Sequence, residues 1–187
     1  MILLMFGASL WSGHAWSGDS FRLSEWPASM PAPDIHLMDT EGRQRHMADY
    51  RGKVVIIYFG FARCPEVCPT TLATLARVMR TLGGVAGQVQ VLFVTLDPEH
   101  DTPAVLRSYL SVFGSGFIGL TGSHADINAA AESFSIHYAK VGRGRDYSID
   151  HSTGIYACDK TGRLRLVGDP DTRAEDWTHD LRLLAER

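Results

Sequence analysis

The residues of this chain best suited to chemistry are Cys64 and Cys68, which three residues separate. This spacing lets both sulfur atoms converge on one point, so the pair can form a disulfide or chelate one metal ion. The cysteines lie in a polar segment with Pro65 and Pro69, directly after the apolar run of residues 54–59. Cysteines that only fill a core need no such segment. We therefore interpret the pair as functional.

The elements around the cysteines predict their reactivity. The apolar run of residues 54–59 is typical of a buried strand, and Pro69 suits the first position of a helix, where a missing N–H costs nothing. A helix N-terminus favours negative charge, so we expect the pKa of Cys68, which precedes Pro69, to be lowered. Thiolates are soft ligands that suit Cu(I) or Zn(II), and either ion needs at least a third ligand.

His151 is the best candidate for that third ligand among the eight histidines. It lies in a polar loop just before a late strand. In thioredoxin-like folds, which the order of strand, thiol loop and helix resembles, the corresponding loop approaches the reactive cysteines. A histidine on a surface loop is the alternative interpretation. The other histidines are assigned no functional role: His14, His36, His46, His100, His124, His137 and His179.

Two further residues have competing interpretations. Asp97 ends a predicted buried strand, where α/β sheets gather functional groups. Its carboxylate would orient a ligand, bind the metal ion more weakly, or cap the turn of residues 98–101. Cys158 lies in a late apolar strand, and we interpret it as a core thiol rather than a ligand.

The remaining pattern predicts an α/β fold. Apolar residues at helical spacing alternate with short apolar runs, and the last two runs form a hairpin. The predicted helices span residues 70–82, 103–113, 123–134 and 172–184. The predicted strands span residues 35–37, 54–59, 89–96, 117–120, 136–141, 154–158 and 164–167. This order indicates a sheet with helices on both faces, and a thioredoxin-like topology fits it.

Composition and the N-terminal segment restrict the class of protein. A length of 187 residues suits one domain, and a net charge of −3 without a basic cluster gives no reason to expect nucleic-acid binding. Residues 2–11 resemble the apolar region of a secretory signal, although no basic residue precedes Arg22. We expect three parts: a signal peptide or truncated anchor at residues 1–18, a linker at 19–33 and the domain at 34–187.

Four segments together resemble the Sco/SenC family, and they occur in the family's order. They are YFGFARCPEVCPTTL, VLFVTLDPEHDTP, FIGLTG and YSIDHSTGIYACDKTGRL. The resemblance runs from about Asp34 to the hairpin after Gly162. The combination of CPxxCP, DPExDTP and a later DHS is highly specific. The chain departs from the family in lacking the usual transmembrane anchor and in carrying Cys158 where members often have an apolar residue.

The resemblance implies a thioredoxin-like fold, with a central mixed sheet flanked by helices, and one bound copper ion, Cu(I) or Cu(II). The implied ligands are Cys64, Cys68 and His151, with Asp97 as a candidate supporting residue. The resemblance implies a protein that delivers copper to the CuA site in subunit II of cytochrome c oxidase or reduces the cysteines of that site. The implied partners are that subunit and a periplasmic copper donor. The implied location is the periplasm or the outer face of the bacterial cytoplasmic membrane.

Three other functions compete with copper delivery. A thiol-disulfide reductase acting on the CuA cysteines would use the same dithiol and would not need His151. A thiol peroxidase is disfavoured, because the residues around Cys64 lack the Pro-x-x-x-Thr/Ser-x-x-Cys pattern of peroxiredoxins. Copper sensing in signalling would use the same ligands, so the sequence does not separate it from delivery.

Overall fold

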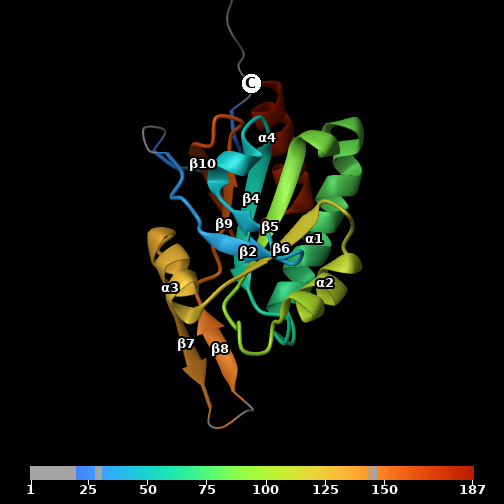
Figure 1. Ribbon diagram of the computed structural model, residues 1–187. Coiled ribbons are helices and arrows are strands. Elements are labelled where there is room, and N and C mark those ends of the chain that lie inside the picture. The colour runs from blue at the N-terminus through green and yellow to red at the C-terminus, as the bar shows by residue number, and fades with distance from the viewer. Residues whose placement is uncertain (1–19, 28–30, 143, 145–146) are drawn as a thin grey trace, which may run out of the picture.

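The computed structural model describes residues 20–27, 31–142, 144 and 147–187 (Figure 1). Its centre is a pair of parallel strands, β4 (Val54–Gly60) and β5 (Val89–Thr95), in which every residue is buried. Continuous apolar runs of this kind are typical of strands covered on both faces. The two strands that the sequence predicts as buried are therefore confirmed.

The described residues form an eight-stranded sheet in the order β1-β10-β9-β4-β5-β6-β2-β3, and a separate hairpin of β7 and β8. β4, β5 and β6 run parallel, and the other neighbours are antiparallel. The bounds are β1 Ser24–Glu25, β2 Leu37–Asp39, β3 Gln44–Arg45, β6 Phe117–Thr121, β7 Tyr138–Val141, β8 Ser148–His151, β9 Ile155–Cys158 and β10 Leu164–Gly168. The segments that follow β4, β5 and β6 therefore meet at one edge.

Helices cover the sheet, and α1 packs against α4 (Figure 1). Their bounds are α1 Val67–Leu82, α2 Pro103–Ser111, α3 His124–Ser133 and α4 Ala174–Glu186, with short 3₁₀ helices η1 Met47–Tyr50 and η2 Gly83–Gln88. The hydroxyls of Thr102 and Ser123 cap α2 and α3 by accepting hydrogen bonds from backbone N–H groups. The mixed sheet and flanking helices confirm the predicted thioredoxin-like fold.

Part of the stretch predicted as a linker, residues 19–33, packs against the domain. β1 pairs with β10, and Leu23 is buried. The buried carboxylate of Asp180 in α4 accepts hydrogen bonds from the backbone N–H groups of Arg22 and Leu23 at 2.8–3.0 Å. The described part of this arm is thus an edge of the folded domain. The predicted signal or anchor at residues 1–18 lies outside the described residues.

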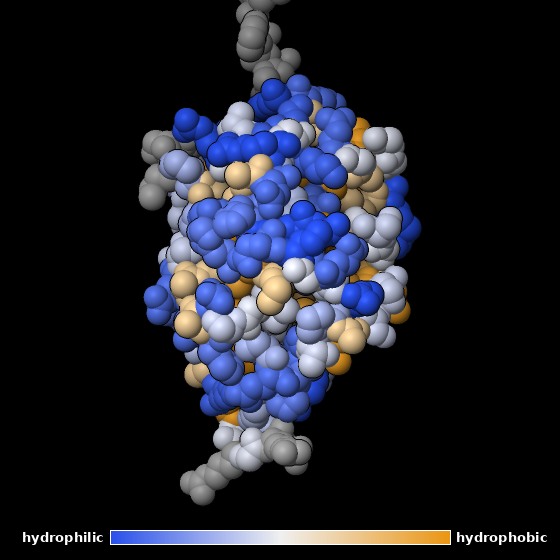
Figure 2. Space-filling view, viewed as in Figure 1, coloured by the Kyte–Doolittle hydropathy of each residue, from blue (hydrophilic) through white to orange (hydrophobic). Residues whose placement is uncertain are grey.

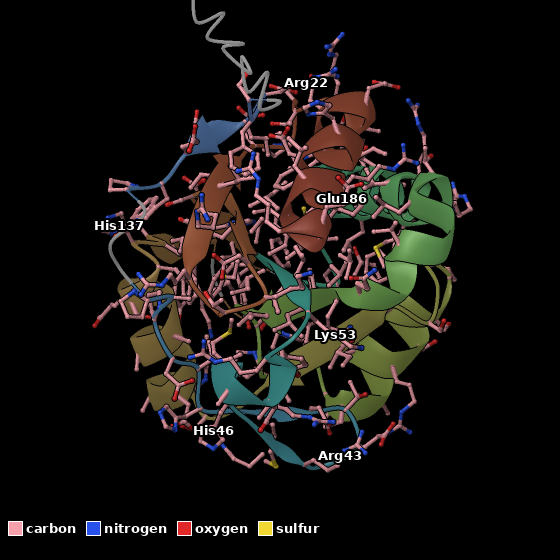
Figure 3. All side chains as sticks on the ribbon, turned by 90° about the horizontal axis from the view of Figure 1, so that it is seen from above. Arg22, Arg43, His46, Lys53, His137 and Glu186 are labelled. Atoms are coloured by element: carbon pink, nitrogen blue, oxygen red, sulfur yellow. The ribbon has the colours of Figure 1, made fainter. Side chains whose placement is uncertain are left out.

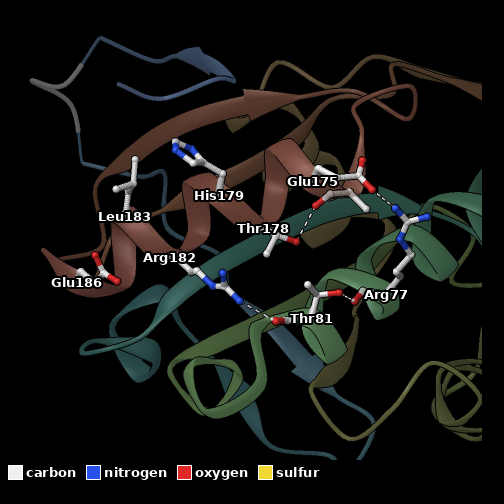
Figure 4. A pocket seen from close by; sticks show the side chains of 9 residues that line it. Arg77, Thr81, Glu175, Thr178, His179, Arg182, Leu183 and Glu186 are labelled. Carbon is white, nitrogen blue, oxygen red and sulfur yellow. Dashed lines mark hydrogen bonds and ion pairs between the residues drawn. The ribbon is translucent and has the colours of Figure 1, made fainter. Parts of the chain in front are cut away.

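One face of the molecule shows few extended apolar areas. The face in Figure 2 is mostly hydrophilic, with scattered apolar side chains. A groove between α1 and α4 is bridged by the ion pair of Arg77 with Glu175 and by a hydrogen bond from Arg182 to the Thr81 carbonyl (Figure 4). Thr81 lies about 20 Å along α1 from Cys68, so this groove is separate from the thiols. None of the described helices is both apolar enough and long enough to cross a bilayer.

Candidate metal centre

The two cysteines lie together where β4 ends and α1 begins. Cys64 is in the connecting loop and Cys68 is the second residue of α1. The backbone N–H of Cys68 donates to the Cys64 sulfur at 3.4 Å, and both thiols are free. Cys68 is fully buried, whereas Cys64 is half-buried. The structure therefore forms a dithiol with one accessible sulfur atom.

The helix begins earlier than the sequence predicts. α1 starts at Val67, so Pro69 is its third residue rather than its first. Pro69 still costs no hydrogen bond, because the first four N–H groups of a helix lack partners within it. Cys68 consequently lies inside the first helical turn, where its side chain packs into the core.

Burial, not the helix terminus, decides the acidity of Cys68. Removal of the thiol from water raises its pKa to about 12, and the expected lowering is therefore wrong. The Cys68 sulfur packs closely against Gly60, which has no side chain. A Cβ atom at Gly60 would lie 2.8 Å from that sulfur. A metal ion that binds Cys68 must displace its proton.

His151 is the last residue of β8, rather than part of a loop as the sequence predicts. Its Nδ1 lies 2.7 Å from the carbonyl oxygen of Ser152. Since a carbonyl can only accept, Nδ1 donates its proton to it, and in the neutral ring Nε2 is the nitrogen with the lone pair that a metal ligand requires. The ring meets Phe61 edge-on, with 6.1 Å between centroids. Phe61 precedes Cys64 by three residues, so His151 lies at the dithiol end of the sheet.

The three predicted ligands do not form a closed site in this structure. Among the described residues, the groups whose donor atoms all lie within 4.8 Å of one another do not include His151 with the two cysteines. Cys64 and Cys68 are adjacent, and His151 is carried by the separate β7–β8 hairpin. Joint coordination requires the His151 nitrogen and the two sulfur atoms to come closer together.

Asp97 lies between these two elements. Its side chain is fully buried and accepts hydrogen bonds from Tyr147 at 2.5 Å and from Arg63 at 3.3 Å. His100 Nδ1 lies 3.1 Å from both carboxylate oxygens. Burial raises the pKa of Asp97, but hydrogen bonds from Tyr147, His100 and Arg63 outweigh it, and the net pKa is lowered. The backbone carbonyl of Asp97 accepts hydrogen bonds from the N–H groups of His100 and Asp101, and so closes the turn that follows.

The sequence pattern assigned no role to Arg63, Tyr147 or His100. In the structure, all three side chains contact the carboxylate of Asp97. Arg63 is next to Cys64, and Tyr147 directly precedes β8. Tyr147 also lies 3.0 Å from a carboxylate oxygen of Glu99. The network thus links the thiol loop to the hairpin that carries His151. In the sequence, the feature that could have pointed to Tyr147 is its position four residues before the predicted ligand His151.

Asp101 holds the start of the thiol loop by hydrogen bonding. Its buried carboxylate accepts hydrogen bonds from the N–H of Ala62 at 2.9 Å and the hydroxyl of Thr95 at 2.6 Å. Burial raises its pKa, although these hydrogen bonds oppose the rise. Asp101 therefore anchors the chain as it leaves β4.

Cys158 is separate from the dithiol. It is fully buried in β9, where it lies opposite Val55 near the start of β4. The dithiol follows the other end of β4, five residues or about 17 Å from Val55. Burial raises the pKa of Cys158 to about 12. The interpretation of Cys158 as a core thiol is confirmed.

Comparison with known proteins agrees with this arrangement. The SCO1/SenC family model matches residues 28–186. The bovine mitochondrial SCO2 homolog is 40% identical over 159 residues, which cover 83% of this chain and 60% of the bovine protein. This chain thus spans less than two thirds of that relative's length.

Solved structures are similar along most of the chain. Bradyrhizobium japonicum ScoI with copper bound is 33% identical, has a TM-score of 0.76, and is matched over 83% of this chain and 99% of that one. The apo Sco1 protein from Thermus thermophilus is 35% identical, has a TM-score of 0.81, and is matched over 90% and 99% of the two chains. Fold, dithiol loop and family model agree, and the chain belongs to the SCO1/SenC family.

Proposed function

We propose that this protein binds one copper ion through Cys64, Cys68 and His151 and delivers it to the CuA site in subunit II of cytochrome c oxidase. The observation that carries the proposal is the free dithiol at the end of β4, with the Nε2 lone pair of His151 on the neighbouring hairpin. The Sco family is associated with cytochrome c oxidase assembly, and solved relatives contain copper.

The proposed ligands suit a transferable copper ion. Two thiolates favour Cu(I), and the imidazole nitrogen also tolerates Cu(II). Oxidation of Cys64 and Cys68 to a disulfide removes both thiolates, so the redox state of the pair controls copper affinity. Since Cys64 is half-buried and Val67 is 41% exposed, the ligands of a partner can approach this side of the site. The proposed compartment is the periplasm or the outer membrane face, where a copper donor would load the protein.

The test is an anaerobic titration of the reduced full chain with Cu(I) and then Cu(II). We expect one tightly bound Cu(I) ion, lost in the Cys64→Ser/Cys68→Ser double variant and weakened in His151→Ala, and we expect the double variant to lose the share of Cu(II) binding that depends on the two thiolates. Circular dichroism would verify that each variant folds. Failure of the wild-type chain to bind copper specifically would refute the proposal, and an unchanged affinity in His151→Ala would remove His151 from the ligand set.

Thiol-disulfide reduction is the second candidate, favoured by the accessible sulfur of Cys64 above the buried thiol of Cys68. In this reaction the Cys64 thiolate attacks a partner disulfide, and Cys68 then releases the reduced partner as the Cys64–Cys68 disulfide forms. Reduction of an oxidised CuA-type peptide by wild type and His151→Ala at equal rates, without specific copper binding, would favour this function.

A further inference from the structure

A second group of metal-ligating side chains lies outside the dithiol site. Asp34, His36 and His46 each offer one donor atom, and these atoms all lie within 4.8 Å of one another. Asp34 and His36 precede β2, and His46 precedes η1. Figure 3 shows the His46 side chain near the β2–β3 edge, well away from Glu186 in the terminal helix.

Asp34 is held in place by the backbone. Its Oδ1 accepts hydrogen bonds from the N–H groups of Ile35 at 2.9 Å and Met47 at 2.8 Å. Its Oδ2 faces His36 Nε2 at 3.3 Å and His46 Nδ1 at 3.7 Å. One carboxylate oxygen therefore fixes two chain segments, and the other is directed at two imidazole nitrogens.

The two imidazoles direct one nitrogen each at the same carboxylate oxygen. Their centroids are 4.6 Å apart and their planes are nearly perpendicular. A neutral ring can present either an N–H or a lone pair at the nitrogen that faces Oδ2, so the same two nitrogens can donate to the carboxylate or bind a cation beside it. One divalent cation satisfies both nitrogens and the oxygen together. The side chains of Asp34, His36 and His46 are 50%, 65% and 39% exposed, so water can complete the coordination.

We propose that Asp34, His36 and His46 bind one divalent transition-metal ion, such as Cu(II) or Zn(II). Imidazole and carboxylate donors favour such ions over Cu(I), which prefers thiolates. Asp126 in α3 adds a negative charge close to His36. The strand order places β2 three positions from β4, about 14 Å away, so this ion is distinct from the cargo of the dithiol. The proposal does not depend on the proposed function.

The test uses the full chain carrying Cys64→Ser and Cys68→Ser, which removes the thiol ligands. Calorimetric titration with Zn(II) or Cu(II) should give one equivalent, and the Cu(II) EPR spectrum should show coupling to two imidazole nitrogens. His36→Gln or His46→Gln should each weaken binding about tenfold or more, since even the loss of an outer partner of a metal ligand costs that much.

His124→Gln is the matched control, because His124 lies 3.1 Å from a single carboxylate, that of Glu99. It should bind the ion as tightly as the double-serine parent. Absence of specific binding in the parent, or equal affinity in the parent and in both test variants, would overturn the proposal. Should the parent fail to fold, amide NMR of the wild-type chain with two equivalents of Zn(II) should shift signals of residues 34–47. NMR signal shifts restricted to the thiol loop would contradict the proposed site at Asp34, His36 and His46.

Discussion

At the scale of single residues, the two proposed thiol ligands differ in burial, although only three residues separate them. Cys68 is within the first turn of α1, where the helix field favours a thiolate, yet its burial raises the pKa to about 12. Desolvation thus outweighs the field of the helix terminus. Cys64 is the more accessible sulfur, and we infer that incoming copper or a partner thiol reaches it first.

Gly60 tests how closely the core must fit around Cys68. A Cβ atom there would lie 2.8 Å from the Cys68 sulfur and 3.0 Å from the Phe93 ring. We expect Gly60→Ala to lower the free energy of unfolding by about 1–3 kcal/mol, as overpacking does, and to weaken Cu(I) binding. Urea unfolding and copper titration would measure both. Gly87→Ala is the control, since a Cβ atom there meets nothing within 4 Å; equal effects of the two substitutions would contradict the packing argument.

Cys158 should be inert in the folded protein. With a pKa of about 12, roughly 1 in 10⁴ of its thiol is ionised at pH 8, and the side chain is fully buried. We expect iodoacetamide to alkylate Cys64 before Cys158 in the native chain and to alkylate all three cysteines in guanidinium chloride, as read by mass spectrometry. Native labelling of Cys158 as fast as that of Cys64 would show that the core thiol is accessible.

At the scale of elements, the β7–β8 hairpin must hold His151 near a loop from a distant part of the chain. Tyr147 does this by contacting Asp97 and Glu99 after β5, and its ring lies under the guanidinium of Arg63 at 5.2 Å. The anchor is therefore a hydrogen-bonded and charged network rather than a strand ladder. Such a network holds the hairpin through side chains. Side-chain contacts leave the hairpin backbone free to shift toward the thiols.

Tyr147→Phe should loosen this anchor. Loss of hydrogen bonds to charged groups costs about 1.5–3 kcal/mol, so we expect faster amide exchange in β8 and a copper affinity about tenfold lower or less. Hydrogen exchange by mass spectrometry and Cu(II) titration would measure these effects. Tyr138→Phe is the control on the same hairpin, because its hydroxyl contacts Asn128 instead. Unchanged exchange in β8 of Tyr147→Phe would rule out the anchor.

At the scale of the whole molecule, the parallel strands bring the site together. β4 leads to the dithiol, β5 to Asp97 and Asp101, and β6 to α3, all at one edge of the sheet. The first and last strands of the sheet order, β1 and β3, are each held by a buried carboxylate. Asp180 holds the arm that contains β1, and Asp39 binds Arg43 and Arg45 across the β2–β3 turn.

Asp39 makes the stability of the whole fold depend on pH. Burial raises its pKa, but the backbone N–H and guanidinium of Arg43, the N–H of Glu41 and the guanidinium of Arg45 lower it to about 2. Because this folded pKa lies below the ordinary value of 3.8, the carboxylate stabilises the fold above about pH 4. That contribution, of order 2 kcal/mol for a side chain only 2% exposed, is lost as the pH falls from about 4 to about 2.

Urea unfolding from pH 7 to pH 2 would measure this effect. We expect Asp39→Asn to be less stable than wild type at pH 7 and the two curves to converge near pH 2. Glu41→Gln is the control, since that side chain is 61% exposed and an exposed ion pair contributes little. Parallel pH profiles for wild type and Asp39→Asn would contradict the linkage.

Local patterns in the sequence were sufficient to predict the architecture. Apolar runs predicted β4 and β5, and apolar residues at helical spacing predicted α2 and α3, because these features depend on neighbours a few residues apart. The spacing of Cys64 and Cys68 likewise predicted a dithiol beside a helix start.

Only the tertiary structure decided the environment of those residues. The burial of Cys68, the Tyr147–Asp97 contact and the group formed by Asp34 and the two histidines depend on which strands and loops pack together. Residues 97 and 147 are far apart in the chain, and no local periodicity encodes their contact. The sequence by itself therefore determined which side chains can do chemistry, while the packing of the sheet determined their acidity and their partners, because desolvation and hydrogen bonding act through space.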